Sequence, residues 1–318
     1  MRVKNKKNLL QILKGQLAKQ DGVVYMKIQF VKHSELNKEK WNHCIKHSFF
    51  PTFFADFDFL SIANPDFCAL ILNDYEAVMP LPVRKKMFLH YIYHPHFVSV
   101  LGIFCKTHPT KELIEYFLKA IPKHYVRVDL IFNTFFDHPQ TSALHSYQLS
   151  LQKKYDEIYA HFSDNCRRNI KFSEKFALKY VESTSVAEII ALFKNNRGKN
   201  IKVPFKEKDY EILKSLAYFA QKSNHLEVIS VLGDENEILA GALLFKDEHK
   251  TWFWFSGRDE KYAEKKAMFF LLNEYFKRNA ETETIFDFHG SMNPNIARFN
   301  AGFGAKKYGV SMLKKRLI

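Results

Sequence analysis

The chain has 318 residues, of which 47% are apolar and 26% are charged, and this balance excludes a wholly disordered or collagen-like chain. Because domains average roughly 150 residues, this length predicts two of them. Lysine and arginine total 48 against 34 for aspartate and glutamate, and the resulting formal charge of +14 favours an anionic partner: a nucleotide phosphate, RNA, CoA or an anionic membrane face.

The first half of the chain predicts a mixed α/β domain at 26–145, which follows a basic N-terminal extension at 1–25. Pro80 and Pro82 predict that their strand is frayed or at a sheet edge, because proline donates no ladder hydrogen bond. The basic run at 84–86 predicts a solvated turn. The strands are expected at 26–31, 67–73, 75–83, 88–93 and 125–132, and the helices at 34–48, 52–62 and 110–120.

The stretch 133–146 predicts a linker, since Asp137-His138-Pro139 interrupts any regular pattern. We therefore place the domain boundary at about residue 145 and the second domain at 146–318. Its helices are expected at 151–162, 165–176, 186–196, 206–222, 262–279 and 295–301, and its strands at 177–182, 227–232, 238–245, 251–256, 284–288 and 308–317. The two halves share one order of elements, which predicts two related α/β domains side by side, each with its own sheet flanked by helices.

Common catalytic and metal-binding motifs are absent from the sequence. There is no GxSxG, HExxH or GxxxxGK[ST] string, which argues against a common serine hydrolase, a zincin and a P-loop NTPase. The four cysteines are far apart and form no CxxC pair, so we expect no disulfide framework, no metal site and a reducing, cytoplasmic location. The apolar runs are too short for a membrane helix, and we expect no integral membrane association.

One candidate site lies at the end of a predicted strand, in the string Asp287-Phe288-His289. Side chains alternate along a strand, so Asp287 and His289 are expected on the same face. Gly290 allows the chain to leave the strand sharply. An aspartate and a histidine at this spacing suit a proton acceptor and the group that orients it, although a simple strand-end pair is the alternative.

Basic residues supply a second set of candidates. Arg167 and Lys171 recur with helical spacing and form a stripe with Arg168 beside it, on a helix that carries little negative charge. Such a stripe indicates an anionic partner, and a solvated face is the alternative. Arg298 and Lys306 have the same two interpretations: each of them suits binding of a phosphate group, and each equally suits a solvated surface position.

Several strings resemble those of a known family, the FemAB-like branch of the GNAT (acyl-CoA N-acyltransferase) superfamily. Residues 287–291 (DFHGS) and 298–304 (RFNAGFG) resemble its C-terminal signature, a strand ending in D-F-x-G-S and a helix with F-K-x-x-F-G. Residues 165–171 (NCRRNIK) resemble its R-R-x-I-R/K helix. The strings at 78–86 and 101–104 resemble first-domain strands of uncharacterised bacterial members, and the resemblance covers about 26–318.

The resemblance implies two tandem GNAT-like domains, each a mixed, mostly antiparallel sheet flanked by helices. Characterised Fem enzymes move an amino acid from aminoacyl-tRNA to an amine on a peptidoglycan precursor, and relatives use acyl-CoA. Ser291 and Phe299 lie in the matching strings and are expected to bind substrate. The family's CoA loop is rich in glycine, whereas the corresponding stretch 262–268 has none, so no tightly bound cofactor is expected. Asn300 stands where the family string has a lysine.

These features lead to one main functional hypothesis and two alternatives. The main hypothesis is an N-acyltransferase or aminoacyltransferase, with acyl-CoA or aminoacyl-tRNA as donor and an unidentified amine as acceptor. Asp287 or His289 would accept the amine proton, and Arg167, Arg168, Lys171, Arg298 and Lys306 would hold the anionic part of a substrate. The alternatives are a ligand-binding protein that kept the fold without catalysis, which the glycine-free stretch favours, and a basic RNA-binding module.

Overall fold

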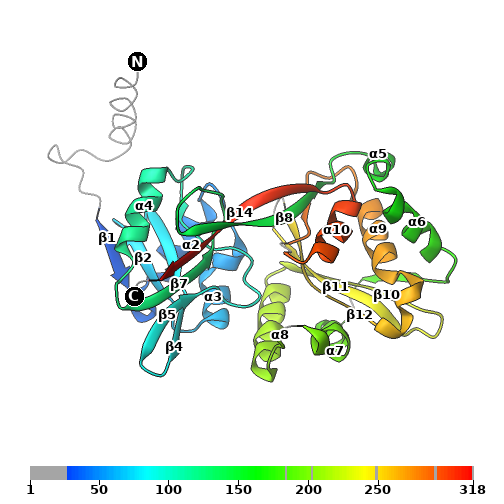
Figure 1. Ribbon diagram of the computed structural model, residues 1–318, viewed down its shortest axis with the longest axis horizontal. Coiled ribbons are helices and arrows are strands. Elements are labelled where there is room, and N and C mark those ends of the chain that lie inside the picture. Colours follow the sequence, from blue (N-terminus) through cyan, green and yellow to red (C-terminus); the bar gives the residue numbers. More distant parts are fainter. Residues whose placement is uncertain (1–26, 183–184, 202, 248–249, 290–291, 317–318) are drawn as a thin grey trace, which may run out of the picture.

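The computed structural model describes residues 27–182, 185–201, 203–247, 250–289 and 292–316 (Figure 1). The predicted extension at 1–25 and the candidate Ser291 lie outside these residues. Within them, helices flank two β-sheets, which confirms the predicted mixed α/β class. None of the described helices is long and apolar enough to cross a bilayer.

The smaller sheet belongs to the first half and has the strand order β1 (Ile28–Val31), β2 (Cys68–Leu72), β3 (Ala77–Leu81) and β6 (Phe104–Cys105). β3 therefore lies inside this sheet at Ala77 and Val78, where the prediction of a frayed or edge strand is wrong, but beyond Val78 it pairs with β2 alone, as an edge strand does. Pro80 is tolerated there because β6 pairs only with Ala77 and Val78, so no partner strand needs the missing N–H of Pro80.

The described residues of the first half also form three helices and two short 3₁₀ turns, and the helices pack against the smaller sheet or against each other. Asn37 caps the first of these helices by accepting the N–H of Lys40, and Trp41 and Ile45 form its buried face. The elements are η1 (His33–Glu35), α2 (Lys38–Lys46), η2 (Phe53–Ala55), α3 (Phe57–Ala63) and α4 (Lys111–Ala120).

The larger sheet runs through both halves of the chain, so the prediction of a separate sheet for each half is wrong. In spatial order its ten described strands are β4 (Val83–Lys86), β5 (Leu89–Tyr93), β7 (Tyr125–Ile131), β14 (Lys306–Arg316), β8 (Thr141–Ser150), β13 (Ile285–Asp287), β12 (Lys250–Arg258), β11 (Ile238–Lys246), β10 (Leu226–Leu232) and β9 (Lys179–Glu182). Pairing is antiparallel except for β5 with β7 and β12 with β13.

The strands β8 and β14 form the junction between the halves, and Figure 1 shows them as a long ribbon pair that joins the two bodies. β14 pairs with β8 over Lys306–Leu313 and with β7 over Met312–Arg316. The predicted linker at 133–146 is thus wrong from Thr141 onward, because this segment gains a ladder of hydrogen bonds from β14. The predicted boundary at about residue 145 falls inside β8, and the division into domains stays a prediction.

Helices cover both faces of the sheet in the second half. On one face the helices are α5 (Tyr155–Ala160), α6 (Asp164–Ser173), α9 (Ala267–Asn279) and α10 (Pro294–Gly302), and on the other α7 (Val186–Asn195) and α8 (Glu207–Lys222). Alternate residues of β10 and β11 enter the two hydrophobic cores, as expected for a sheet buried on both sides. The predicted helix at 151–162 is shorter than expected, because only α5 and no residue before Tyr155 is helical.

Candidate functional site

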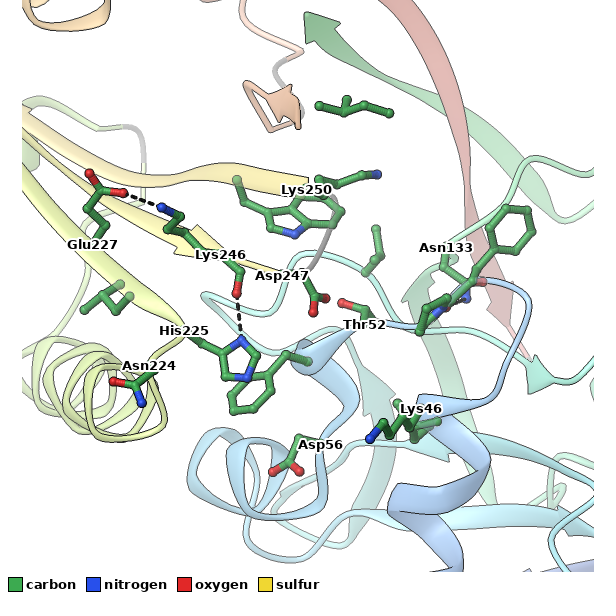
Figure 2. Close-up of a pocket in the computed structure, with 18 of the residues that line it drawn as sticks. Lys46, Thr52, Asp56, Asn133, Asn224, His225, Glu227, Lys246, Asp247 and Lys250 are labelled. Carbon is green, nitrogen blue, oxygen red and sulfur yellow. Dashed lines mark hydrogen bonds and ion pairs between the residues drawn. The ribbon is translucent and has the colours of Figure 1, made fainter. Parts of the chain in front are cut away.

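A large cleft lies between the two halves and has a volume of about 1390 Å³. Its first wall comes from the end of α2, the segment that joins α2 to η2, and η2 itself. This wall includes Lys46, Thr52 and Asp56 (Figure 2). Its second wall comes from the end of α8 and the ends of β10, β11 and β12. Phe54 stacks on Phe245 with ring centroids 4.7 Å apart, so the two halves are packed against each other beside the cleft.

The cleft contains charges of both signs and is not a basic surface. Lys246 forms an ion pair of 2.9 Å with Glu227, and the backbone oxygen of Lys246 contacts the ring of His225 at 2.7 Å (Figure 2). Burial raises the pKa of Asp56, whose carboxylate also caps α3. The charged residues of the described lining are Lys46, Lys246 and Lys250, and Asp56, Glu182, Glu227 and Asp247.

Asp287, at the end of β13, is the centre of a hydrogen-bond network that includes Tyr308 of the cleft lining. The side chain is fully buried. Its Oδ1 accepts the Ser146 hydroxyl at 2.9 Å, and its Oδ2 accepts the Gln148 amide at 3.0 Å and the Tyr308 hydroxyl at 2.6 Å. The strand register explains this arrangement, because Gln148 is opposite Asp287 and Tyr308 is opposite Ser146. A buried carboxylate with this many donors holds each of them in a fixed direction.

Tyr308 carries the network to the surface of the cleft. Burial raises the pKa of its phenol above the ordinary range, and the carboxylate of Asp287 adds to that rise. Hydrogen bonds from Ser146 and Gln148 act in the opposite sense. The phenol therefore stays protonated and donates to Asp287, so its oxygen acts toward other groups only as an acceptor. Lys250 Nζ lies 3.6 Å from Asp287 Oδ2 and 4.5 Å from the centre of the Trp252 ring, so a cation is held beside the same groups.

A smaller cavity of about 120 Å³ adjoins the cleft, and Tyr308 and Trp252 line both. His289 lines this smaller cavity, where its Nε2 forms a hydrogen bond with the hydroxyl of Ser99. Burial lowers the pKa of His289, although Asp287 acts in the opposite sense. The imidazole is therefore neutral near pH 7 and can accept a proton.

Trp252 supplies an unused donor beside these groups. Its side chain is 6% exposed, and its indole Nε1 has no hydrogen-bond partner among the described residues. A buried N–H without an acceptor costs free energy, so such groups are usually satisfied by water or by a ligand. The indole N–H can thus donate to the oxygen of a bound carbonyl group.

The structure brings Asp287 and His289 together, but not in the expected way. β13 ends at Asp287, and His289 has a φ of 63°, so strand alternation does not place its side chain. The two are joined instead by the backbone N–H of His289, which donates to Asp287 Oδ1 at 3.0 Å. Asp287 lines neither cavity, which makes it a positioning residue, whereas His289 is accessible from the smaller cavity.

Of the other predicted residues, those that the structure describes line neither cavity. Arg167, Arg168 and Lys171 lie on α6, where Arg167 forms an ion pair of 2.6 Å with Asp164. Figure 1 shows α6 at the outer side of the second half. Their role in substrate binding stays a prediction, as does that of the residues near the C-terminus. Of these, Arg298 and Lys306 are exposed, Phe299 packs on Phe269 and Phe303, and Ser291 lies outside the described residues.

The glycine-free stretch 262–268 does not begin the predicted helix, because α9 starts only at Ala267. A turn lies between β12 and α9 instead: it contains η4 (Glu260–Lys265), and Lys266 adopts the left-handed conformation with a φ of 55°. The parallel pairing of β12 with β13 ends at Trp252 and Asp287. Beyond this point the two segments separate, and the rings of Phe253, Phe288 and Phe303 lie between them. Aromatic side chains therefore occupy this space.

Sequence reasoning missed Ser99, Ser146, Tyr308, Lys250 and Trp252. Ser146 lies 141 positions from Asp287, and Ser99 lies 190 positions from His289. Nothing local marks them as partners. The alternation of Ser146 and Gln148 is a weak signal, but it becomes visible only once the segment is known to be a strand. Among the described residues, no group of three or more His, Cys, Asp or Glu residues is arranged to hold a metal ion.

Comparisons with known proteins agree with this geometry. Among solved structures, FemX superimposes with a TM-score of 0.61 at 12% identity, over 90% of this chain and 97% of FemX. L-PGS from Bacillus licheniformis gives 0.54 at 13% identity, over 88% of this chain and 92% of that one. A conserved protein of unknown function from Bacteroides thetaiotaomicron VPI-5482 gives 0.52 at 10% identity, over 92% of this chain and all of the other (100%). No curated protein matches the sequence.

A family match covers the second half. Residues 161–295 match the family described as an acetyltransferase (GNAT) domain, a stretch that includes Lys250, Trp252, Asp287 and His289. At such low identities the solved structures show the fold alone, whereas the family match rests on the sequence of this segment. The chain therefore carries a GNAT-type acetyltransferase domain within a two-domain-like fold shared with FemX.

Proposed function

We propose that the protein is an N-acyltransferase or aminoacyltransferase whose reaction occurs where the cleft meets the smaller cavity. The observation that carries this proposal is Tyr308, a residue that lines both spaces and whose hydroxyl is oriented by a bond of 2.6 Å to the buried Asp287. Close to it are a neutral imidazole, an ammonium group and an unused indole N–H. These are the groups that acyl transfer to an amine requires.

The reaction joins the nitrogen of an amine to the carbonyl carbon of the donor. As this N–C bond forms, the carbonyl oxygen gains negative charge, and the bond to the leaving sulfur or oxygen then breaks. The amine loses one proton to His289, and the leaving group takes a proton from the same imidazole. The catalyst is thereby regenerated without any further reactant.

The described side chains have distinct parts in this reaction. The Tyr308 oxygen accepts an N–H of the amine and aligns its lone pair with the carbonyl carbon. Lys250 and the indole N–H of Trp252 donate to the developing oxyanion. Ser99 holds the ring of His289, and Asp287 fixes Tyr308. The acidic residues of the cleft, such as Asp247 and Glu182, suit an acceptor that carries a positive charge.

Aminoacyl-tRNA fits the turn before α9 better than acyl-CoA does, because the turn has no glycine and aromatic rings border the adjoining space. A tRNA is also large enough to contact α6 outside the cleft, where Arg167, Arg168 and Lys171 form their basic stripe. Arg298 and Lys306 are exposed on the same half and would extend that contact. A ligand-binding protein without catalysis is the second candidate, since the same lack of glycine favours it.

A transfer assay separates the two candidates. Donors are labelled acetyl-CoA and a mixture of tRNAs charged with labelled amino acids, and acceptors are free lysine and a peptidoglycan precursor nucleotide. His289→Ala and Tyr308→Phe should each lower turnover by roughly 10²–10⁴-fold. Tyr155→Phe is the matched control, because its hydroxyl also forms a hydrogen bond, 2.7 Å long and to Asn273, away from the cleft. If the wild-type protein binds a donor but never transfers its label, the proposal that the protein is an enzyme is refuted.

A further inference from the structure

The hairpin of β4 and β5 carries an apolar tip that no element of the described residues covers. Phe88 at the tip is 94% exposed, Met87 is 74% exposed and Leu89 is 42% exposed. Met87 has a φ of 53°, so the tight turn directs these neighbouring side chains outward from the end of the hairpin. Figure 1 shows the hairpin at the lower edge of the first half, beyond the helices. Large apolar side chains grouped in this way mark an interaction site.

The strand that leads to this tip is strongly basic. Arg84, Lys85 and Lys86 of β4 are all exposed, and no aspartate or glutamate occurs between Val83 and Tyr93. The Arg84 guanidinium lies 5.3 Å from the centre of the Tyr93 ring at the base of the hairpin. An apolar tip with a cationic collar combines the two features by which a protein surface binds an anionic lipid interface.

The charges of β4 also argue against a second copy of this chain as the occupant. β4 is an edge strand, which in principle can pair with another β4 to extend the sheet. Such an antiparallel pair would place Arg84, Lys85 and Lys86 of each copy beside the same residues of the other. Like charges opposite one another destabilise a strand pair, whereas phospholipid headgroups would neutralise them.

We propose that the β4–β5 hairpin docks the protein on an anionic phospholipid membrane. Met87 and Phe88 enter the boundary between headgroups and acyl chains, and Lys85 and Lys86 contact the lipid phosphates. Two aliphatic side chains with a single aromatic ring suit insertion among acyl chains better than stacking on nucleic-acid bases, which needs a series of rings. The proposal goes beyond the proposed function, because it requires no turnover.

Co-sedimentation with vesicles tests the proposal. Vesicles contain phosphatidylcholine alone or phosphatidylcholine mixed with phosphatidylglycerol, and the wild-type chain should bind only the second kind at low salt. The double variant Met87→Ser with Phe88→Ser should lower the partition coefficient at least about tenfold, because two large apolar side chains no longer enter the interface. Phe135→Ser is the matched control, since Phe135 is 55% exposed elsewhere and should not contribute.

A second pair of variants isolates the local charge. Lys85→Glu with Lys86→Glu should abolish binding to phosphatidylglycerol vesicles, whereas Lys111→Glu with Lys119→Glu on α4 changes the net charge equally and should retain most of it. Equal losses in both pairs would mean that only net charge matters, and would overturn the proposal. So would tip variants that bind vesicles normally but lose binding to tRNA, or that convert a dimer to a monomer in sedimentation velocity.

Discussion

Replacing Asp287 with Asn tests whether this carboxylate organises the candidate site. Its two oxygens accept hydrogen bonds from the Ser146 hydroxyl, the Gln148 amide, the Tyr308 hydroxyl and the backbone N–H of His289, at 2.6–3.0 Å. An asparagine keeps one of these oxygens and presents an N–H₂ group to Gln148 and Tyr308. A hydrogen bond to a charged acceptor contributes about 1.5–3 kcal/mol to stability, whereas one to a neutral acceptor contributes about 1 kcal/mol. A neutral amide is easier to bury than a carboxylate, which offsets part of this loss. The substitution should therefore lower the free energy of unfolding by about 2–4 kcal/mol.

Urea unfolding of wild type and variant measures this cost directly. The control is Asp259→Asn, because Asp259 caps η4 at the surface and asparagine caps a helix equally well, so its effect should stay within about 0.5 kcal/mol. Turnover gives a second measurement: Tyr308 must now accept from the amide and turn its hydroxyl toward the cleft, so Asp287→Asn should lower kcat as far as Tyr308→Phe does. A variant with unchanged stability would refute the view that Asp287 holds these four donors.

Three further predictions concern other parts of the molecule. Burial lowers the pKa of His94 to about 4, and the neutral native ring accepts the Ile131 N–H. Below about pH 6.5 the unfolded chain therefore takes up a proton that the native chain does not, and the free energy of unfolding should fall by about 3 kcal/mol between pH 6.5 and pH 4. Urea titrations of His94→Gln should show a shallower fall. A Cβ at Gly257 would lie 2.7 Å from the backbone N of Phe193, so Gly257→Ala should cost about 1–3 kcal/mol in thermal unfolding, whereas Gly309→Ala, with 3.4 Å to its nearest neighbour, should cost less. Acetyl-CoA should bind with a Kd above roughly 1 mM in calorimetry, and micromolar affinity would contradict the account of the turn before α9.

Elements with strong local signals could be predicted from the sequence. The strands expected at 227–232 and 238–245 correspond to β10 and β11, and the helix expected at 206–222 corresponds to α8. Each has a regular apolar period with turn or capping residues at its ends, so short-range physics determines it. The helix expected at 262–279 corresponds to α9, although it starts only at Ala267 because η4 and the left-handed Lys266 precede it.

Long-range pairing explains what the sequence could not show. Residues 141–146 have a polar, irregular composition, and only β14, more than 150 positions later, makes them a strand. Lys85 and Lys86 are a different case: they are solvated as predicted, but they belong to β4 and not to a turn, because β5 pairs with them in a local hairpin. Asp287 was found because it ends a recognisable string, whereas Tyr308 and Ser146 have no such string. Their function depends on a pairing that no local pattern encodes.

The position of the site on the junction strands has a mechanical consequence. Ser146 and Gln148 lie on β8 and Tyr308 lies on β14, and these two strands are also the ones that connect the halves. The groups that orient Tyr308 therefore sit on paired strands inside a sheet, where they cannot shift independently. The cleft wall formed by α2 and η2 has no such connection to Asp287. In the proposed mechanism, movement of that wall would change the entry of the acceptor amine while the strand pairs keep the geometry around Tyr308 constant, so entry of the amine and its alignment would be controlled by different parts of the fold.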